Sequence, residues 1–207
     1  MILLITLMVL PIQVISSRHV PEVQSVHSPR YLDLSTLDQN YNGESDRMKA
    51  LIPKGLKEFA SIPYRIQGVI RPGGSSNETG SFVETTLKVN DSFSNFYFLH
   101  GVEGETDLGI VIAEFLIHYQ DGGQMKIPVE YGVHVLSWKF WEYIPPRDSS
   151  SKMVWVGQDS ESKSNHSAFR LFHTPWRNPH PDRVVESIVY STTQSECRPF
   201  VLAMTLD

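Results

Sequence analysis

The chain has 207 residues, of which 41% are hydrophobic and 20% are charged, and its formal net charge at pH 7 is -5. This length suits one well-filled domain, and this composition excludes disordered and collagen-like proteins. The negative charge, together with scattered Lys and Arg residues, argues against a nucleic-acid partner.

An apolar segment opens the chain. Residues 1–16 have the length and composition of a signal peptide, although no Lys or Arg precedes the apolar run. Pro11 and Gln13 interrupt the run before the roughly 20 apolar residues that a membrane span needs. We therefore expect a signal peptide or short apolar leader, a linker over residues 17–30 and a single domain over residues 31–207. A short membrane anchor, a mis-assigned start and a piece of a longer chain remain alternatives.

Export follows from this interpretation of the leader. The protein is expected to be secreted, periplasmic or at the cell surface, and not an integral membrane protein unless the leader is retained. Cys197 is the only cysteine, so no intrachain disulfide supports the fold. A secreted domain without disulfides fits a bacterial exported protein better than a small animal ectodomain.

Short apolar alternations, separated by Gly, Pro, Asn, Asp and Ser, dominate the chain from residue 62 onward. This pattern is typical of all-β proteins. The one weak helical pattern, over residues 44–59, is broken by Pro53 and Gly55. About nine strands are expected, at residues 64–70, 82–90, 94–100, 110–119, 125–138, 152–157, 169–173, 184–190 and 200–206.

The arrangement of these strands follows from their number. So many strands without helices to cover them require two packed sheets or a closed barrel. Asp121-Gly122 predicts a tight hairpin between two of the strands. In the second of these, apolar residues alternate with polar ones through Val135, which indicates a half-buried strand. We predict an all-β fold, an antiparallel jelly-roll-like β-sandwich with little or no helix.

Enzyme motifs are absent from the sequence: it has no nucleophile elbow, zinc-protease motif, phosphate-binding loop or thiol pair. The acidic loop with Glu103, Glu105 and Asp107 has three interpretations. It is a solvated turn, a calcium site built from hard oxygen ligands, or part of the carboxylate pair of a glycoside hydrolase. We expect no catalytic residue and no cofactor, with calcium as the one alternative.

Aromatic and polar side chains gather in two segments. Residues 138–143 leave a predicted strand and enter a Pro-Pro loop, which can expose their rings. Residues 174–178 lie in a proline-stiffened connector, which either is scaffold or forms half of a sugar-binding rim. Sugar rings stack on Trp and Tyr, while their hydroxyls pair with Asn and Arg. The candidate ligand-binding residues are Trp138, Trp141, Tyr143, Trp176, Arg177 and Asn178, and packing is the alternative role for the tryptophans.

Six short motifs follow one another after residue 31, namely PYRIQG (63–68), NFYFLHG (95–101), FLIHYQDGG (115–123), IPVEYGVHVLSW (127–138), VWVG (154–157) and TPWRNPHPDRVVESI (174–188). In this order they resemble the galactose-binding-type jelly-roll modules of bacterial exported proteins, which are often appended to glycoside hydrolases. The resemblance implies a non-catalytic accessory domain of the carbohydrate-binding class, with a carbohydrate or cell-surface glycan as its partner. A structural or protein-interaction domain is the alternative, and a glycoside-hydrolase-type enzyme is a distant third.

Overall fold

Antiparallel strands make up most of the computed structural model, which describes residues 28–35, 44–71, 84–193 and 196–207. The predicted leader and most of the predicted linker lie outside these residues. The strands are β1 (Arg30–Tyr31), β2 (Gly55–Phe59), β3 (Ile62–Ile66), β4 (Glu84–Asp91), β5 (Asn95–Glu103), β6 (Val111–Tyr119), β7 (Gln124–Glu130), β8 (Lys139–Phe140), β9 (Lys152–Gly157), β10 (Ala168–Arg177), β11 (Val185–Thr192) and β12 (Arg198–Leu206). Two short helices accompany them, α1 (Glu44–Leu51) and α2 (Ser160–Ser164).

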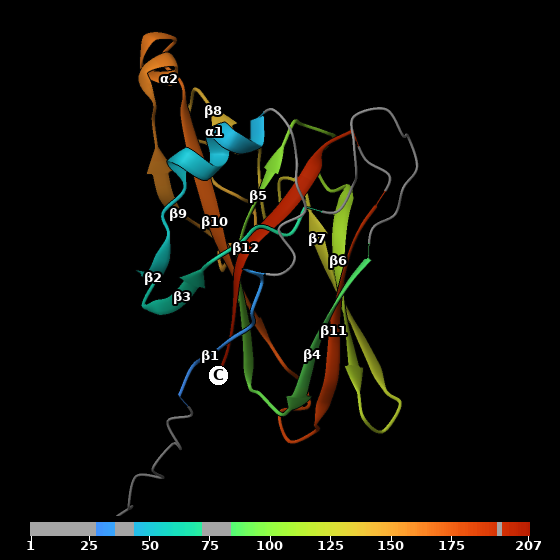
Figure 1. The fold of residues 1–207 in the computed structure, drawn as a ribbon. Coiled ribbons are helices and arrows are strands. Elements are labelled where there is room, and N and C mark those ends of the chain that lie inside the picture. Colours follow the sequence, from blue (N-terminus) through green and yellow to red (C-terminus); the bar gives the residue numbers. More distant parts are fainter. Residues whose placement is uncertain (1–27, 36–43, 72–83, 194–195) are drawn as a thin grey trace, which may run out of the picture.

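Two sheets and one separate hairpin contain these strands. The larger sheet has the order β1-β12-β5-β10-β8, with β9 also paired to β10, and the smaller sheet has the order β4-β11-β6-β7. Strands β2 and β3 form the hairpin. Figure 1 shows the two sheets facing each other. The predicted all-β, antiparallel sandwich is confirmed.

Aromatic side chains fill the space between the two sheets. The ring of Phe115, on β6, lies 5.0 Å from that of Phe96, 4.7 Å from that of Phe98 and 4.8 Å from that of Tyr190, measured between centroids. All four side chains are fully buried. Burying one such side chain contributes roughly 1.5–3 kcal/mol, so this cluster is a main source of sandwich stability.

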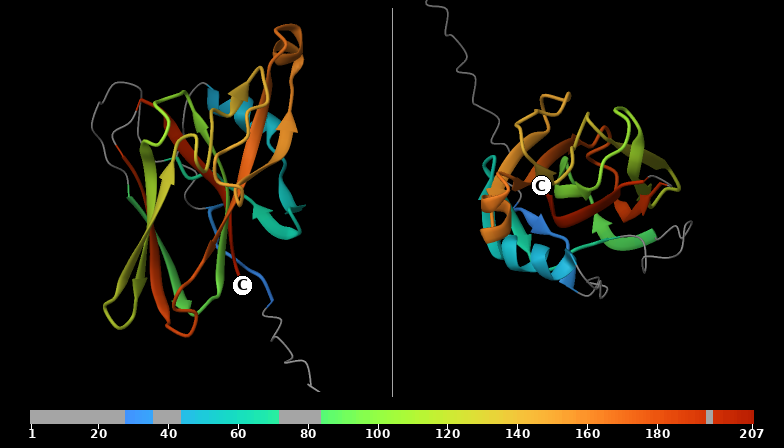
Figure 2. Two further views of the ribbon diagram at one scale, coloured as in Figure 1. Left: turned by 180° about the vertical axis from the view of Figure 1, so that it is seen from behind. Right: turned by 90° about the horizontal axis from the view of Figure 1, so that it is seen from above.

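The larger sheet also buries its other face. Leu99, Leu171 and Leu202 point away from the sandwich interior and belong to a second hydrophobic cluster, to which α1 contributes Met48 and β3 contributes Tyr64. Figure 2 shows α1 and the β2–β3 hairpin on the outer side of this sheet. The molecule therefore has three layers where the sequence predicted two.

All nine predicted strands have a counterpart in the structure, but two of them end early: the strand predicted over residues 64–70 ends at Ile66, and the one predicted over residues 125–138 ends at Glu130. Ile127 and Val129 are buried as predicted, whereas β7 stops at Glu130. Gly132 has a φ of 78°, and its amide donates to the carbonyl of Val135 at 2.7 Å, so the chain turns there. The prediction of a strand through Val135 was wrong because alternation cannot distinguish a strand from a turn that buries the same apolar residues. The predicted hairpin at Asp121-Gly122 is confirmed.

Two neutral histidines are buried inside the larger sheet. His100, on β5, lies 2.8 Å through Nε2 from the hydroxyl of Thr174, and His173, on β10, lies 2.5 Å through Nδ1 from the hydroxyl of Tyr64. Burial lowers the pKa of His100 to about 3, with nearby His134 and His173 adding to the effect. Burial, with nearby Lys152, lowers the pKa of His173 to about 4. Both rings therefore stay uncharged well below neutral pH.

These histidines predict that acid destabilises the fold. In the unfolded chain each ring gains a proton as the pH falls below 6.5, whereas the folded chain accepts it only near pH 3–4. The contribution of these two neutral rings to the free energy of unfolding is present above pH 6.5 and is lost as the pH falls. We expect the free energy of unfolding to drop between pH 7 and pH 5 by about 2 kcal/mol for each histidine, measured by urea denaturation.

The variant His100→Gln provides the control, because glutamine can still hydrogen-bond Thr174 but does not titrate. Whatever its absolute stability, it should lose about half of this pH dependence. Equal unfolding free energies for the natural chain at pH 7 and pH 5 would contradict the prediction.

Candidate functional site

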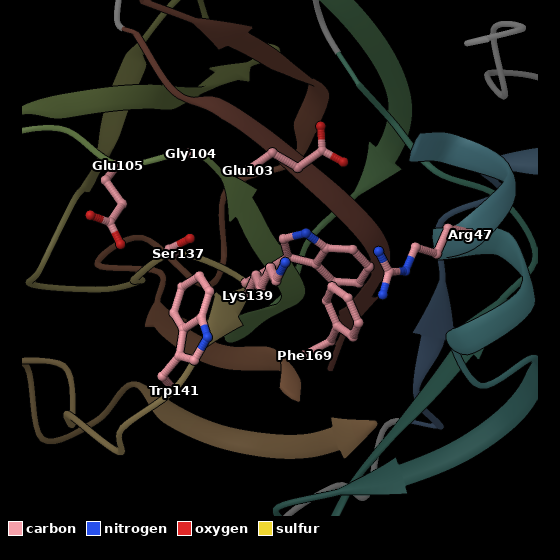
Figure 3. Close-up of a pocket in the computed structure, with 9 residues that line it drawn as sticks. Arg47, Glu103, Gly104, Glu105, Ser137, Lys139, Trp141 and Phe169 are labelled. Atoms are coloured by element: carbon pink, nitrogen blue, oxygen red, sulfur yellow. The ribbon is translucent and has the colours of Figure 1, made fainter. Parts of the chain in front are cut away.

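A pocket of about 360 Å³ opens where β5 ends and β10 begins. Four segments that are distant in sequence meet there: α1, the loop after β5, residues 137–141 and the start of β10. The amide of Trp138 donates to the carbonyl of Val102 at 2.7 Å, and β8 pairs with Ala168 and Phe169. These backbone contacts place the residues that surround β8 across the end of the larger sheet (Figure 3).

Two buried aromatic rings form the inner side of the pocket. The ring centroids of Trp138 and Phe169 lie 4.4 Å apart, and those of Trp138 and Phe200 lie 5.9 Å apart with the two rings perpendicular. Trp138 is only 4% exposed. Its main role is therefore to extend the hydrophobic core to the pocket.

An exposed indole stands at the mouth of the pocket. Trp141 is 63% exposed, and the ammonium nitrogen of Lys139 lies 5.2 Å from its ring centroid, a cation–π arrangement. Among the described residues, no carboxylate forms an ion pair with Lys139. Figure 3 shows Trp141, Lys139, Ser137 and Glu105 around the same opening. The ring is thus accessible to a ligand, and Lys139, which is half-buried, places a cation beside it.

The carboxylates of the pocket differ in their surroundings. Glu103 is buried, and its Oε1 lies 3.0 Å from a guanidinium nitrogen of Arg71. Glu105 is exposed. Glu105 can therefore accept hydrogen bonds from a ligand, whereas Glu103 already faces a cation inside the protein.

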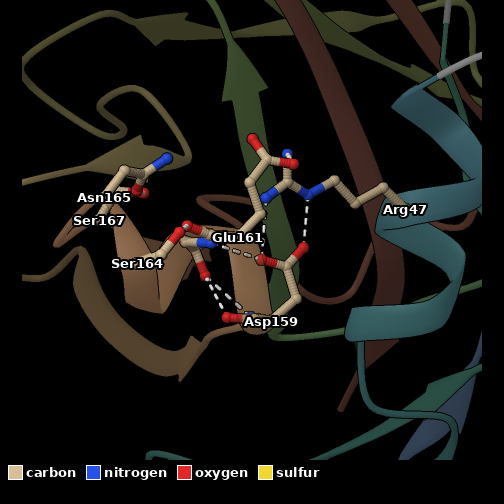
Figure 4. Close-up of polar contacts among 7 residues, drawn as sticks. Arg47, Asp159, Glu161, Ser164, Asn165 and Ser167 are labelled. Atoms are coloured by element: carbon tan, nitrogen blue, oxygen red, sulfur yellow. Dashed lines mark hydrogen bonds and ion pairs between the residues drawn. The ribbon is translucent and has the colours of Figure 1, made fainter.

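Arg47 closes the side of the pocket that α1 forms. Its guanidinium lies over the ring of Phe169 at 4.9 Å and binds both carboxylate oxygens of Asp159, at 2.5 and 2.9 Å. A third guanidinium nitrogen lies 3.1 Å from Glu161 (Figure 4). The hydrogen bonds from Arg47, and then that from the Ser162 amide, lower the pKa of Asp159, which also caps α2. Arg47 thus connects α1 to α2 and defines one wall.

Trp176, Arg177 and Asn178 lie far from this pocket. Trp176 is seven residues beyond Phe169 in β10, roughly 23 Å along the strand. Its ring is half-buried and contacts that of Phe93 at 6.5 Å, and Arg177 is exposed. The structure therefore does not bring the two predicted segments together.

The side chain of Asn178 is buried and makes its hydrogen bonds within the protein. Its side-chain nitrogen donates to the carbonyl of Phe93 at 3.0 Å. Its side-chain oxygen accepts from the hydroxyl of Tyr119 at 2.7 Å and from the amide of His180 at 2.9 Å. These bonds join the loop after β10 to the loop between β4 and β5 and to the end of β6, so the geometry gives Asn178 a structural role.

Tyr143 lies outside the pocket, and the three calcium candidates do not form a metal site. Tyr143 is 57% exposed but does not line the pocket. Glu105 and Asp107 are exposed, while Glu103 faces Arg71. Within the part of the chain that the structure describes, no three His, Cys, Asp or Glu side chains gather to hold a metal ion.

Five residues that line the pocket were not candidates in the sequence analysis, namely Arg47, Gly104, Ser137, Lys139 and Phe169. Arg47 lies in a segment whose helical pattern is weak, and Phe169 lies in a strand that gave no sign of its position at a site. Lys139 had a detectable signal, because it stands between two candidate tryptophans.

The comparisons with known proteins add no relative. No protein-family model, curated protein or solved structure matches this chain. None of the helices in the described residues has the length and apolar character to cross a membrane. The pocket and the fold therefore carry the functional argument.

The two tryptophans of the pocket should respond differently to truncation. Trp138→Ala is expected to lower the free energy of unfolding by about 3–5 kcal/mol, because it leaves a cavity in a packed cluster. Trp141→Ala should change it by no more than about 0.5 kcal/mol, since the side chain is mostly in solvent. Urea denaturation of both variants measures the difference, and a large loss for Trp141→Ala would show that its ring supports the fold.

Proposed function

We propose that this protein is a non-catalytic module that binds carbohydrate at the pocket beside Trp141. The observation that carries the proposal is an indole 63% exposed at the mouth of a cavity of about 360 Å³. An exposed aromatic ring loses contact with water when the apolar face of a sugar covers it. The cavity volume also falls in the range of small-molecule sites.

The polar groups around the ring support a polyhydroxylated ligand. Lys139 supplies hydrogen-bond donors and Glu105 supplies acceptors. Sugar hydroxyls both donate and accept, so they can satisfy both side chains at once. A purely apolar ligand would leave these charges without partners, at a cost in free energy.

The sequence motifs favour the same class of protein. They resemble the galactose-binding-type modules of bacterial exported proteins, and an antiparallel sandwich is compatible with that resemblance. We propose accordingly that the chain is exported and that its partner is a carbohydrate or a cell-surface glycan.

A protein-interaction domain is the second candidate. Apolar side chains outside the pocket are also exposed, among them Tyr143 at 57% and Ile144 at 55%. Catalysis has less support, because glycoside hydrolysis uses two carboxylates, and of the two in the pocket Glu103 is buried and already faces Arg71. We therefore keep a glycoside-hydrolase-type activity as the third candidate.

A glycan array followed by affinity electrophoresis in gels that contain the bound polysaccharide tests the proposal. We expect the natural chain to bind, and Trp141→Ala to bind at least about tenfold more weakly, because it loses roughly 1.4 kcal/mol or more of stacking. The measured quantity is the retardation of each variant as a function of polysaccharide concentration.

Two control variants locate the binding site. Arg177→Ala removes an exposed side chain from the far end of β10, and Leu56→Ala removes an apolar side chain that is 62% exposed. Both should bind like the natural chain. Absence of binding to any glycan, or undiminished binding by Trp141→Ala, would refute the proposed function. Weak binding by Arg177→Ala would show that the glycan binds at residues 174–178 instead.

A further inference from the structure

The segment that carries Trp141 is held at both ends by one buried side chain. Arg170, on β10, donates from Nε to the carbonyl of Ser137 at 2.8 Å and from Nη1 to the carbonyl of Ile144 at 3.3 Å. Trp141 lies between these two points of attachment. Within the described chain, residues 141–143 make no backbone hydrogen bond of their own. The course of the chain around Trp141 therefore depends on where its two ends are fixed.

Arg170 has surroundings that are unusual for an arginine. It is only 4% exposed, and among the described residues it forms no ion pair with a carboxylate. Its guanidinium lies instead over the rings of Phe140 at 4.7 Å and Phe172 at 5.3 Å. Burial lowers the pKa of Arg170, the direction expected when a charge leaves water.

Stability alone does not account for such a side chain. A buried charge pays a desolvation penalty, and a well-packed apolar residue in its place is often as stable or more stable. What an apolar residue cannot supply is two donors in a rigid planar group that reaches two separate carbonyls. Lysine cannot replace this geometry either, since its donors all belong to one nitrogen.

We propose that Arg170 is the positioning residue of the pocket, which holds residues 137–144 in the conformation that presents the indole of Trp141 to a ligand. This role deepens the proposed function and rests on it for its biological meaning. The positioning of the segment does not require a ligand. Without the guanidinium, the carbonyl of Ile144 loses its hydrogen-bond donor and the ring of Trp141 samples several positions. β8 itself remains paired with β10 through its backbone.

Fluorine NMR of protein labelled with 5-fluorotryptophan tests this role without a ligand. The chain has four tryptophans, so each can be assigned by its own Trp→Phe variant. In Arg170→Met we expect the Trp141 signal to shift or broaden, while the Trp176 signal, from the far end of β10, stays in place. Arg170→Lys keeps the charge but loses the planar group that reaches both carbonyls. For this variant we expect a smaller change in the Trp141 signal and roughly tenfold weaker glycan binding.

Arg177→Met serves as the matched control, because it removes an exposed arginine from the same strand. Its Trp141 signal should match that of the natural chain. If Arg170→Met folds and alters only the buried Trp138, Arg170 is a core residue and the proposal is overturned. Failure of both the Met and the Lys variants to fold would overturn it as well. A Trp141 signal that responds in a protein that binds no glycan would refute the proposed function and leave the positioning role intact.

Discussion

Burial of both faces of the larger sheet is the constraint on which the rest of the structure depends. Successive residues of a strand point to opposite faces, so β12 sends Val201 into the sandwich and Leu202 to the outer side. A sheet with apolar side chains on both faces needs a cover on each. The smaller sheet covers one, and α1 with the β2–β3 hairpin covers the other. The hydroxyl of Thr205, which donates to the carbonyl of Pro63 at 2.7 Å, helps to fix this third layer.

The pocket is a consequence of this third layer. It lies at the end of the larger sheet, where Arg47 of α1 faces residues that the sandwich itself supplies. The ion pair between Arg47 and Asp159 joins the layer to α2, and the packing of Trp138 on Phe169 extends the outer core to the pocket. A two-layer sandwich would leave Trp138 and Phe169 in solvent. Fold and site therefore share one cluster of aromatic side chains.

Local patterns predicted the strands well and their surroundings less well. Alternation located β4 and β6, and Asp121-Gly122 marked the hairpin, because both signals depend on neighbouring residues alone. The same pattern failed after Glu130, where the positive φ of Gly132 turns the chain. It also gave no sign of β8, whose two residues are strand only because β10 lies beside them.

The sequence by itself determined the all-β class, the antiparallel sandwich and most strand positions. Periodicity and turn chemistry are local properties, so a single chain displays them directly. Only the tertiary structure decided which candidates meet. It exposed Trp141 and buried Trp138, and it separated Trp176 from both by the length of β10. It also placed Arg170 in contact with the segment of residues 137–144. The reason is physical: exposure and proximity depend on how distant segments pack, and no local pattern records that packing.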